Sequence, residues 1–267
     1  MKVAVAGAGG RMGRTLIEAV LADRELTLAA AFDIAGSPAV GTRVGQVTVG
    51  SDVAEALAAA DMLIDFTRPE GTLAHLAACV KAGKPCVIGT TGLSESQEQA
   101  VASAAKRIAV VMSPNFAVAV NVLFSLAEAA GRALGERYDV EIIEAHHRHK
   151  VDAPSGTALK LGEAVAAALN RELKGVVRHG REGQVGERPS REIGFHAIRG
   201  GDIVGEHTVL FAGTGERLEL TVRSQSRATY AAGALRAAKW VRGQPGGFYD
   251  MFDVLGLERT VPSAGLG

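Results

Sequence analysis

The feature that most constrains the fold of this chain is a glycine-rich segment, GAGGRMG at residues 7–13, which follows a short apolar run. Residues 2–6 are typical of a buried strand, and residues 11–22 carry apolar side chains at helical spacing. Glycines at such a junction let the backbone turn sharply and let an anion approach the free amides of the helix. Asp33 ends the next apolar run, where a carboxylate can hydrogen-bond the hydroxyls of an adenosine ribose. The segment therefore predicts a dinucleotide-binding unit.

The same alternation continues to about residue 112. Runs typical of strands cover residues 26–32, 62–66, 86–88 and 108–112, and helical patterns cover residues 54–60, 71–82 and 94–105. Short strands that alternate regularly with helices are typical of βαβ units. We therefore predict an α/β N-terminal domain with a Rossmann-like, doubly wound parallel sheet.

The pattern changes after about residue 115. Helical patterns at residues 118–134 and 157–169 flank an alternating strand at 138–145, and three longer strands follow at 194–198, 202–211 and 216–224. This order predicts an α+β C-terminal domain with a mixed or antiparallel sheet. A last helix at residues 228–242 is expected to return to the first domain. The predicted domains are therefore residues 1–117 with 227–267, and residues 118–226, with residues 262–267 expected to fray.

Composition limits the function. The 29 basic and 29 acidic residues balance, so no overall field attracts nucleic acid or an anionic membrane. No stretch approaches the roughly 18 uninterrupted apolar residues of a membrane span, and the N-terminus lacks the pattern of a signal peptide. The two cysteines, Cys79 and Cys86, are too few for a disulfide framework and lack partners at zinc-ligand spacing. We expect a cytoplasmic protein.

The residue after Asp33 bears on the choice of dinucleotide. An arginine there would bind the 2′-phosphate of NADPH, but this chain has Ile34, and Asp33 would repel that phosphate. Arg11 and Arg14 lie near the loop and could compensate. The local pattern therefore favours NADH, or the use of both NADH and NADPH.

The second informative segment is EAHHRHKVDAPSGTA at residues 144–158. Three histidines, an arginine and a lysine within residues 146–150 need an anion or water beside them. Gly156 and Thr157 open a predicted helix, whose first amides suit a carboxylate. Histidine is also suited to proton transfer near neutral pH. The alternatives are a solvated basic loop, and a metal site for which no further ligand has suitable spacing.

Together these segments resemble the 4-hydroxy-tetrahydrodipicolinate reductase (dihydrodipicolinate reductase) family of bacterial lysine and diaminopimelate synthesis. The resemblance runs from about residue 3 to 257. It rests on residues 7–13 and 144–158, and on IDFT at 64–67, GTTG at 89–92, SPNFAVAVN at 113–121 and RGGDIVGEH at 199–207.

The resemblance implies reduction of 4-hydroxy-tetrahydrodipicolinate, a small dicarboxylate, to tetrahydrodipicolinate by NADH or NADPH, in a homotetramer built on the sheet of the C-terminal domain. His146 and Lys150 match the catalytic residues, although the sequence does not decide which of them delivers the proton. His147, Gly156 and Thr157 match the substrate site. The residues that match cofactor contacts are Gly7, Ala8, Gly9, Gly10, Arg11, Met12, Asp33, Gly89, Thr90, Thr91, Ser113, Pro114, Asn115 and Phe116.

Two other functions are compatible with the glycine loop alone. One is another dehydrogenase of the same architecture, acting on an amino acid or a related compound. The other is a dinucleotide sensor without catalysis, which would leave His146 and Lys150 without a role. The segment at residues 144–158 argues against both, because it presents two anion-binding ends together with proton donors. The tail after Leu257 has no assigned role.

Overall fold

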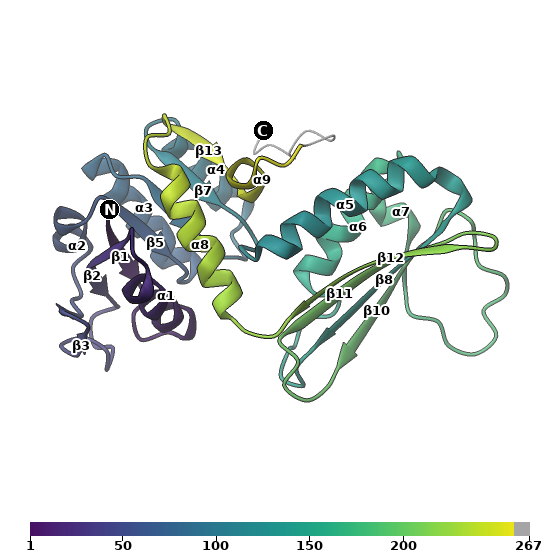
Figure 1. The fold of residues 1–267 in the computed structure, drawn as a ribbon, viewed down its shortest axis with the longest axis horizontal. Helices are drawn as coiled ribbons and strands as arrows, with labels where there is room; N and C mark the ends of the chain where they lie inside the picture. The colour runs from purple at the N-terminus through teal and green to yellow at the C-terminus, as the bar shows by residue number, and fades with distance from the viewer. Residues whose placement is uncertain (259–267) are drawn as a thin grey trace. The chain divides into compact units, whose positions relative to one another are not determined.

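The computed structural model describes residues 1–258; residues 259–267, including the end predicted to fray, lie outside the described residues. The described chain forms two compact units (Figure 1). Unit 1 contains Met1–Val118 and Arg227–Gly256, and unit 2 contains Ala119–Ser226.

Unit 1 is built on a six-stranded sheet in which every neighbouring pair is parallel. In spatial order its strands are β13 (Gly247–Tyr249), β7 (Ala109–Met112), β6 (Cys86–Ile88), β5 (Met62–Asp65), β1 (Lys2–Ala6) and β2 (Thr27–Phe32). The chain leaves β1 for β2 on one side and later adds β5 on the other side. Strand order therefore reverses between β1 and β5, the position where sheets of this kind bind ligands beyond the carboxyl ends of their strands.

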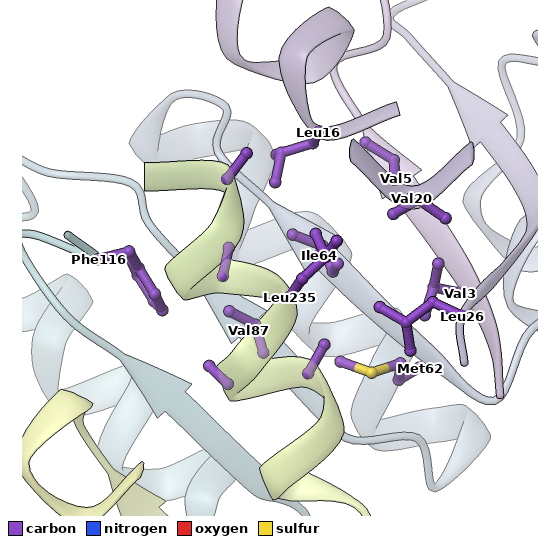
Figure 2. Close-up of a cluster of buried hydrophobic side chains, with 14 of the residues drawn as sticks. Val3, Val5, Leu16, Val20, Leu26, Met62, Ile64, Val87, Phe116 and Leu235 are labelled. Atoms are coloured by element: carbon purple, nitrogen blue, oxygen red, sulfur yellow. The ribbon is translucent and has the colours of Figure 1, made fainter. Parts of the chain in front are cut away.

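Two apolar cores cover the two faces of this sheet. One core joins the sheet to α1 (Arg11–Ala22), α8 (Ala228–Val241) and α9 (Met251–Leu255), with Leu16 and Leu235 packed over Ile64 (Figure 2). The other joins it to α2 (Val53–Ala59), α3 (Pro69–Ala82) and α4 (Glu95–Ala105). Helices on both faces of a parallel sheet confirm the predicted doubly wound α/β fold.

Unit 1 also has short elements that the sequence pattern did not predict. Strands β3 (Arg43–Val44) and β4 (Val47–Thr48) form a small hairpin, and β13 adds the outermost strand of the sheet. Strands of two or three residues are too short to show an alternating pattern.

Unit 2 has a five-stranded mixed sheet, which confirms the second predicted fold class. Its spatial order is β12 (Arg217–Ser224), β11 (Gly205–Ala212), β8 (Asp139–His146), β10 (Ile193–Arg199) and β9 (Val177–His179). The β12–β11 and β11–β8 pairs are antiparallel, and β8–β10 and β10–β9 are parallel. The strand predicted to begin at residue 202 begins at Gly205, because the chain turns at Gly201 with φ +50°.

Helices α5 (Val118–Leu134) and α6 (Gly156–Ala168) lie together on one face of this sheet (Figure 1). A short 3-10 turn, Gly135–Arg137, follows α5, and a single-turn helix, α7 (Leu173–Val176), precedes β9. In the described part of the chain, one helical segment, Val118–Arg137, is long and apolar enough to cross a membrane by length and composition. Its buried Glu128 pairs with the exposed Arg132 (2.9 Å), and Gly131 packs against α6, so we interpret it as a core helix.

The other face of the same sheet carries a network of charged side chains. The Glu141 carboxylate accepts hydrogen bonds from Arg181 (2.7 and 3.1 Å), from Arg188 (2.9 Å) and from the ring Nε2 of His196 (2.7 Å). Burial alone would raise the pKa of Glu141, but these three partners lower it to about 2. The network ties the segment after β9 to the centre of the sheet.

Candidate functional site

The glycine loop of unit 1 has the geometry of an anion-binding turn. Gly7 has φ +69°, and its carbonyl accepts a hydrogen bond from the amide of Gly10 (2.9 Å). A Cβ on Gly13 would lie 1.9 Å from the same carbonyl oxygen, so only glycine lets the helix approach the strand here. Gly10 is the N-cap of α1 and offers no side chain to the amides of the first turn, which include those of Arg11 and Met12. This cradle fits the pyrophosphate of a dinucleotide.

Asp33 lies directly after β2 and is tied to the glycine loop. Its Oδ2 accepts a hydrogen bond from the amide of Gly9 (2.7 Å), and its Oδ1 accepts one from the amide of Ile34 (2.7 Å). Each carboxylate oxygen keeps a second lone pair, so hydroxyl groups can still bind. The side chain of Ile34 is 76% exposed, and Arg11 and Arg14 are exposed as well.

Two further predicted cofactor loops follow neighbouring strands of unit 1. Residues 89–91 follow β6 and residues 113–116 follow β7, so both lie at the same sheet edge as the glycine loop. The amide of Gly89 donates to the carbonyl of Asp65 (2.8 Å), and the hydroxyl of Ser113 donates to the carbonyl of Asn115 (2.9 Å). Ala8, Thr90, Ser113 and Phe116 are buried, whereas Thr91 and Pro114 are exposed.

In unit 2, strand β8 places Glu144 and His146 on the helix-covered face, next to the start of α6. The buried carboxylate of Glu144 accepts a hydrogen bond from His146 Nδ1 (2.6 Å) and two from the guanidinium of Arg199 (both 2.8 Å). The amide of Ser155 donates a further one (3.1 Å). Because an ionised carboxylate can only accept, Nδ1 of His146 carries the proton in this pair, and Nε2 is the ring atom left for chemistry.

The charges around this pair decide its protonation. Burial alone would raise the pKa of Glu144, but the hydrogen bonds from Arg199 and then His146 outweigh it and lower the pKa. Burial lowers the pKa of His146, although Glu144 opposes the shift. The ring is therefore neutral at neutral pH, with a carboxylate positioned to stabilise its charged form.

His207 on β11 completes the buried part of the cluster, and sequence analysis did not single it out. Its ring lies 5.2 Å from that of His146 between centroids, and its Nε2 lies 3.2 Å from the hydroxyl of Ser155. Burial, with a smaller contribution from the nearby His146, lowers the pKa of His207 to about 4. His207 is therefore an uncharged neighbour of His146.

Two of the predicted substrate residues, Gly156 and Thr157, open α6, and the third is His147. Ser155 caps this helix by accepting a hydrogen bond from the amide of Ala158 (3.2 Å), and a Cβ on Gly156 would meet no atom within 4 Å. Thr157 follows in the first turn and is half-buried. The Nδ1 atom of His147 is buried and has no hydrogen-bond partner. An open helix start suits a carboxylate, and so does a buried nitrogen without a hydrogen-bond partner.

Lys150 is linked to Arg199 through Asp152. Its ammonium group donates to the carboxylate of Asp152 (2.8 Å), whose own side chain is 55% exposed. The backbone carbonyl of Asp152 in turn accepts from Arg199 (2.6 Å). The structure thus assembles the predicted catalytic and substrate residues within unit 2, and the predicted cofactor residues within unit 1. Among residues 1–258, no group of three or more His, Cys, Asp or Glu side chains is arranged to hold a metal ion.

Arg199, Glu144 and His207 are the site residues that sequence reasoning did not assign. The signal that could have found them is charge or polarity inside strands. Glu144 shares one face of β8 with the buried Val140 and Ile142, and a carboxylate buried among apolar side chains needs a partner. The partner itself could not be predicted, because Arg199 lies 55 residues further along the chain.

Unit 1 has a parallel sheet with a cradle for a dinucleotide. Unit 2 has a histidine–carboxylate pair beside an open helix start. Together these features are typical of a Rossmann-type oxidoreductase. Family models identify the chain more closely. The model described as "Dihydrodipicolinate reductase, N-terminus" matches residues 1–116, and the model described as "Dihydrodipicolinate reductase, C-terminus" matches residues 119–255. The chain therefore belongs to the dihydrodipicolinate reductase family.

Individual relatives agree with this assignment. The chain is 57% identical to a 4-hydroxy-tetrahydrodipicolinate reductase of Thiobacillus denitrificans, over 97% of this chain and 99% of the relative. It is 56% identical to one of Cupriavidus necator, over 97% of this chain and 100% of the relative. A solved structure of dipicolinate-bound dihydrodipicolinate reductase from Paenisporosarcina sp. TG-14 has the same fold, with a TM-score of 0.77 at 24% identity over 95% of this chain and 98% of that one. A nicotinamide dinucleotide is the cofactor type that this Rossmann-type family implies.

Proposed function

We propose that this chain reduces 4-hydroxy-tetrahydrodipicolinate to tetrahydrodipicolinate in the diaminopimelate and lysine pathway, with His146 as the proton donor. Overall, one hydride and one proton enter and the hydroxyl group leaves as water. The observation that carries the proposal is the Glu144–His146 pair beside the open start of α6. The relatives named as this reductase supply the identity of the substrate.

In this proposal unit 1 holds the dinucleotide and unit 2 holds the substrate. The first-turn amides at Gly10, Arg11 and Met12 bind the pyrophosphate, and Asp33 binds the hydroxyls of the adenosine ribose. A bound reduced nicotinamide supplies the hydride. The loops at residues 89–91 and 113–116 line the rest of the cofactor site. Asp33 and Ile34 favour NADH, or the use of both dinucleotides, because neither side chain can bind a 2′-phosphate.

The two carboxylates of the substrate are bound by donors in unit 2. His147 Nδ1, the start of α6 at Gly156 and Thr157, and the ammonium group of Lys150 are the donors. To bind substrate, Lys150 exchanges the carboxylate of Asp152 for one of the substrate. This exchange costs little free energy, because Asp152 is exposed and the ion pair at the surface is weak.

His146 delivers the proton because bound substrate changes the charge around its ring. The resting ring is neutral, but two substrate carboxylates add negative charge nearby and raise the pKa of the ring. The ring then takes up a proton at Nε2 while Glu144 stabilises the imidazolium through Nδ1. Lys150 assists by binding a carboxylate rather than by donating the proton.

The test is oxidation of NADH and of NADPH by the full chain, started with freshly made product of the preceding synthase. Substrate-dependent oxidation supports the reductase assignment. The variant His146→Asn should lower kcat by about 100-fold or more while the KM for substrate changes little. Lys150→Met should instead raise that KM, by roughly 10-fold for a lost charge-assisted bond. A kcat loss in Lys150→Met matching that of His146→Asn would make the lysine the proton donor. Cofactor binding without turnover by the unmodified chain would indicate a sensor.

Two broader properties belong to the same proposal. We infer a cytoplasmic enzyme, because Cys79 and Cys86 are buried free thiols rather than a disulfide. We also infer a homotetramer built on the face of the unit 2 sheet opposite α5 and α6, where Ile198 is 52% exposed. Light scattering coupled to gel filtration measures the assembly directly, and a monomer in solution would contradict it.

A further inference from the structure

A second buried carboxylate, Asp65, lies at the carboxyl end of β5 and takes no part in the chemistry proposed above. Its side chain is 1% exposed. Oδ1 accepts hydrogen bonds from the amide (2.8 Å) and the hydroxyl (2.6 Å) of Thr67, and Oδ2 accepts one from Nδ1 of His75 (2.8 Å). Three donors satisfy the carboxylate, and all of them come from the segment that leaves β5 and from α3.

A line of hydroxyl groups continues from Asp65 to one of the cofactor loops. The hydroxyl of Thr67 lies 3.3 Å from that of Thr72, and the hydroxyl of Thr72 lies 2.7 Å from that of Thr90. Thr72 and Thr90 are 1% and 3% exposed. Because Thr67 donates its one hydroxyl hydrogen to Asp65, it can only accept from Thr72. The line therefore has one direction, with each hydroxyl donating toward Asp65, and Thr90 is bound at its end.

The same residues touch the glycine loop. A Cβ on Gly7 would lie 2.9 Å from the methyl group of Thr67, so this methyl group packs directly against the turn of the loop. The backbone carbonyl of Asp65 accepts the amide of Gly89 (2.8 Å), which precedes Thr90. The ring of His75 packs edge-on against Phe32 at the end of β2, with 5.0 Å between ring centroids. Asp65 and its partners thus connect the ends of β1, β2, β5 and β6.

We propose that Asp65 and His75 are positioning residues for the dinucleotide, acting through Thr67, Thr72 and Thr90 on the loops at residues 7–12 and 89–91. This inference rests on the proposed binding of the cofactor by unit 1. With the network intact, the loops are ordered before the cofactor arrives. Without it, part of the binding energy is used to order them, so affinity for the cofactor falls.

The sharpest test removes a single hydroxyl group. Thr72→Val keeps the shape of the side chain and breaks the line between Thr67 and Thr90, whereas Thr72→Ser keeps the hydroxyl and should rescue it. The matched control is Val101→Ala, which leaves a cavity in the core shared by α3 and α4 without touching the network. For each full-length variant we would measure the Kd for NADH and NADPH by fluorescence titration, the KM for substrate and the Tm.

We expect Thr72→Val to raise the Kd for both dinucleotides by roughly 3- to 30-fold, because it removes both hydrogen bonds of the Thr72 hydroxyl and leaves the Thr90 hydroxyl without this partner. The KM for substrate should change less than about 2-fold, because the proposed substrate residues lie in unit 2 and Thr72 lies in unit 1. Val101→Ala should lower the Tm without raising the Kd, and Asp65→Asn should weaken cofactor binding at least as much as Thr72→Val. A wild-type Kd in Thr72→Val, or equal Kd changes in Thr72→Val and Val101→Ala, would overturn the inference. No cofactor binding by the unmodified chain would instead overturn the proposed function.

Discussion

The replacement Glu144→Gln, compared with Glu141→Gln, separates catalysis from folding in unit 2. The carboxylate of Glu144 accepts four hydrogen bonds, from Arg199, His146 and the amide of Ser155. Glutamine has nearly the same shape, but both oxygens of Glu144 accept from Arg199, so the NH₂ group faces the guanidinium in either orientation, and a guanidinium can only donate. Removing one partner of a buried ion pair costs roughly 3–5 kcal/mol. Arg199 is 20% exposed and can partly rehydrate, so we expect a loss of about 2–4 kcal/mol in the free energy of unfolding.

The replacement should also lower kcat, for a reason separate from this loss of stability. Without Glu144, nothing fixes the proton on Nδ1 of His146, and the charged form of the ring loses the carboxylate that stabilises it. Proton transfer by a positioned group contributes roughly 100- to 10,000-fold, and we expect kcat to fall by about 100-fold. The pH at which activity is half-maximal should also move to lower values, because the pKa of the ring falls.

The chain offers a close control in Glu141→Gln. Glu141 lies on the same strand, three residues earlier and on the opposite face, and it binds two arginines and a histidine where Glu144 binds one arginine and a histidine. This variant should lose comparable stability in urea unfolding and keep its kcat. If Glu144→Gln kept kcat within about 3-fold of the unmodified chain while His146→Asn was inactive, Glu144 would not control His146, and the assigned roles would be wrong.

Two further predictions address cofactor choice and acid stability. Ile34→Arg should raise the ratio of NADPH to NADH specificity constants by about 10-fold, through a charge-assisted bond to the 2′-phosphate; an unchanged ratio would mean that Arg11 or Arg14 already binds that phosphate. The pKa of His207 is lowered to about 4 in the folded state, so the unfolded chain takes up a proton first as the pH falls below about 6.5. Stability should therefore drop by about 2 kcal/mol between about pH 7 and pH 5, and His207→Gln should reduce this dependence in urea titrations; an unchanged dependence would place the titrating group elsewhere.

The sequence pattern was sufficient for the architecture where elements were long and periodic. The strands and helices of unit 1 up to residue 112 follow the predicted alternation, and the segment at residues 144–158 lies where a strand meets a helix. The β3–β4 hairpin and β13 were missed because strands of two or three residues show no alternation. Their pairing depends on the rest of the sheet rather than on their own sequence.

The candidate site was predictable in its local parts and not in its long-range partners. Residues that are adjacent in sequence, such as His146 and His147, or Gly156 and Thr157, could be recognised as a group. The contacts that fix their chemistry join distant segments. His207 reaches Ser155 from 52 residues away, and nothing in either local sequence specifies that contact. Pairing of buried polar groups is decided by the tertiary fold, so sequence shows only that a partner is needed.

Both units contain a buried carboxylate that is hydrogen-bonded to a histidine. In each, a buried carboxylate near the end of a strand binds Nδ1 of a histidine and a backbone amide of the segment that follows. In unit 1, Asp65 binds His75 and the amide of Thr67. In unit 2, Glu144 binds His146 and the amide of Ser155. The difference lies in the remaining donor. Glu144 has the guanidinium of Arg199, which keeps it ionised although it is buried, so it can stabilise a ring that gains a proton. Asp65 has a hydroxyl group instead, which fixes the direction of a hydrogen-bond line without adding charge. The same local arrangement therefore suits proton transfer in unit 2 and rigid positioning of loops in unit 1.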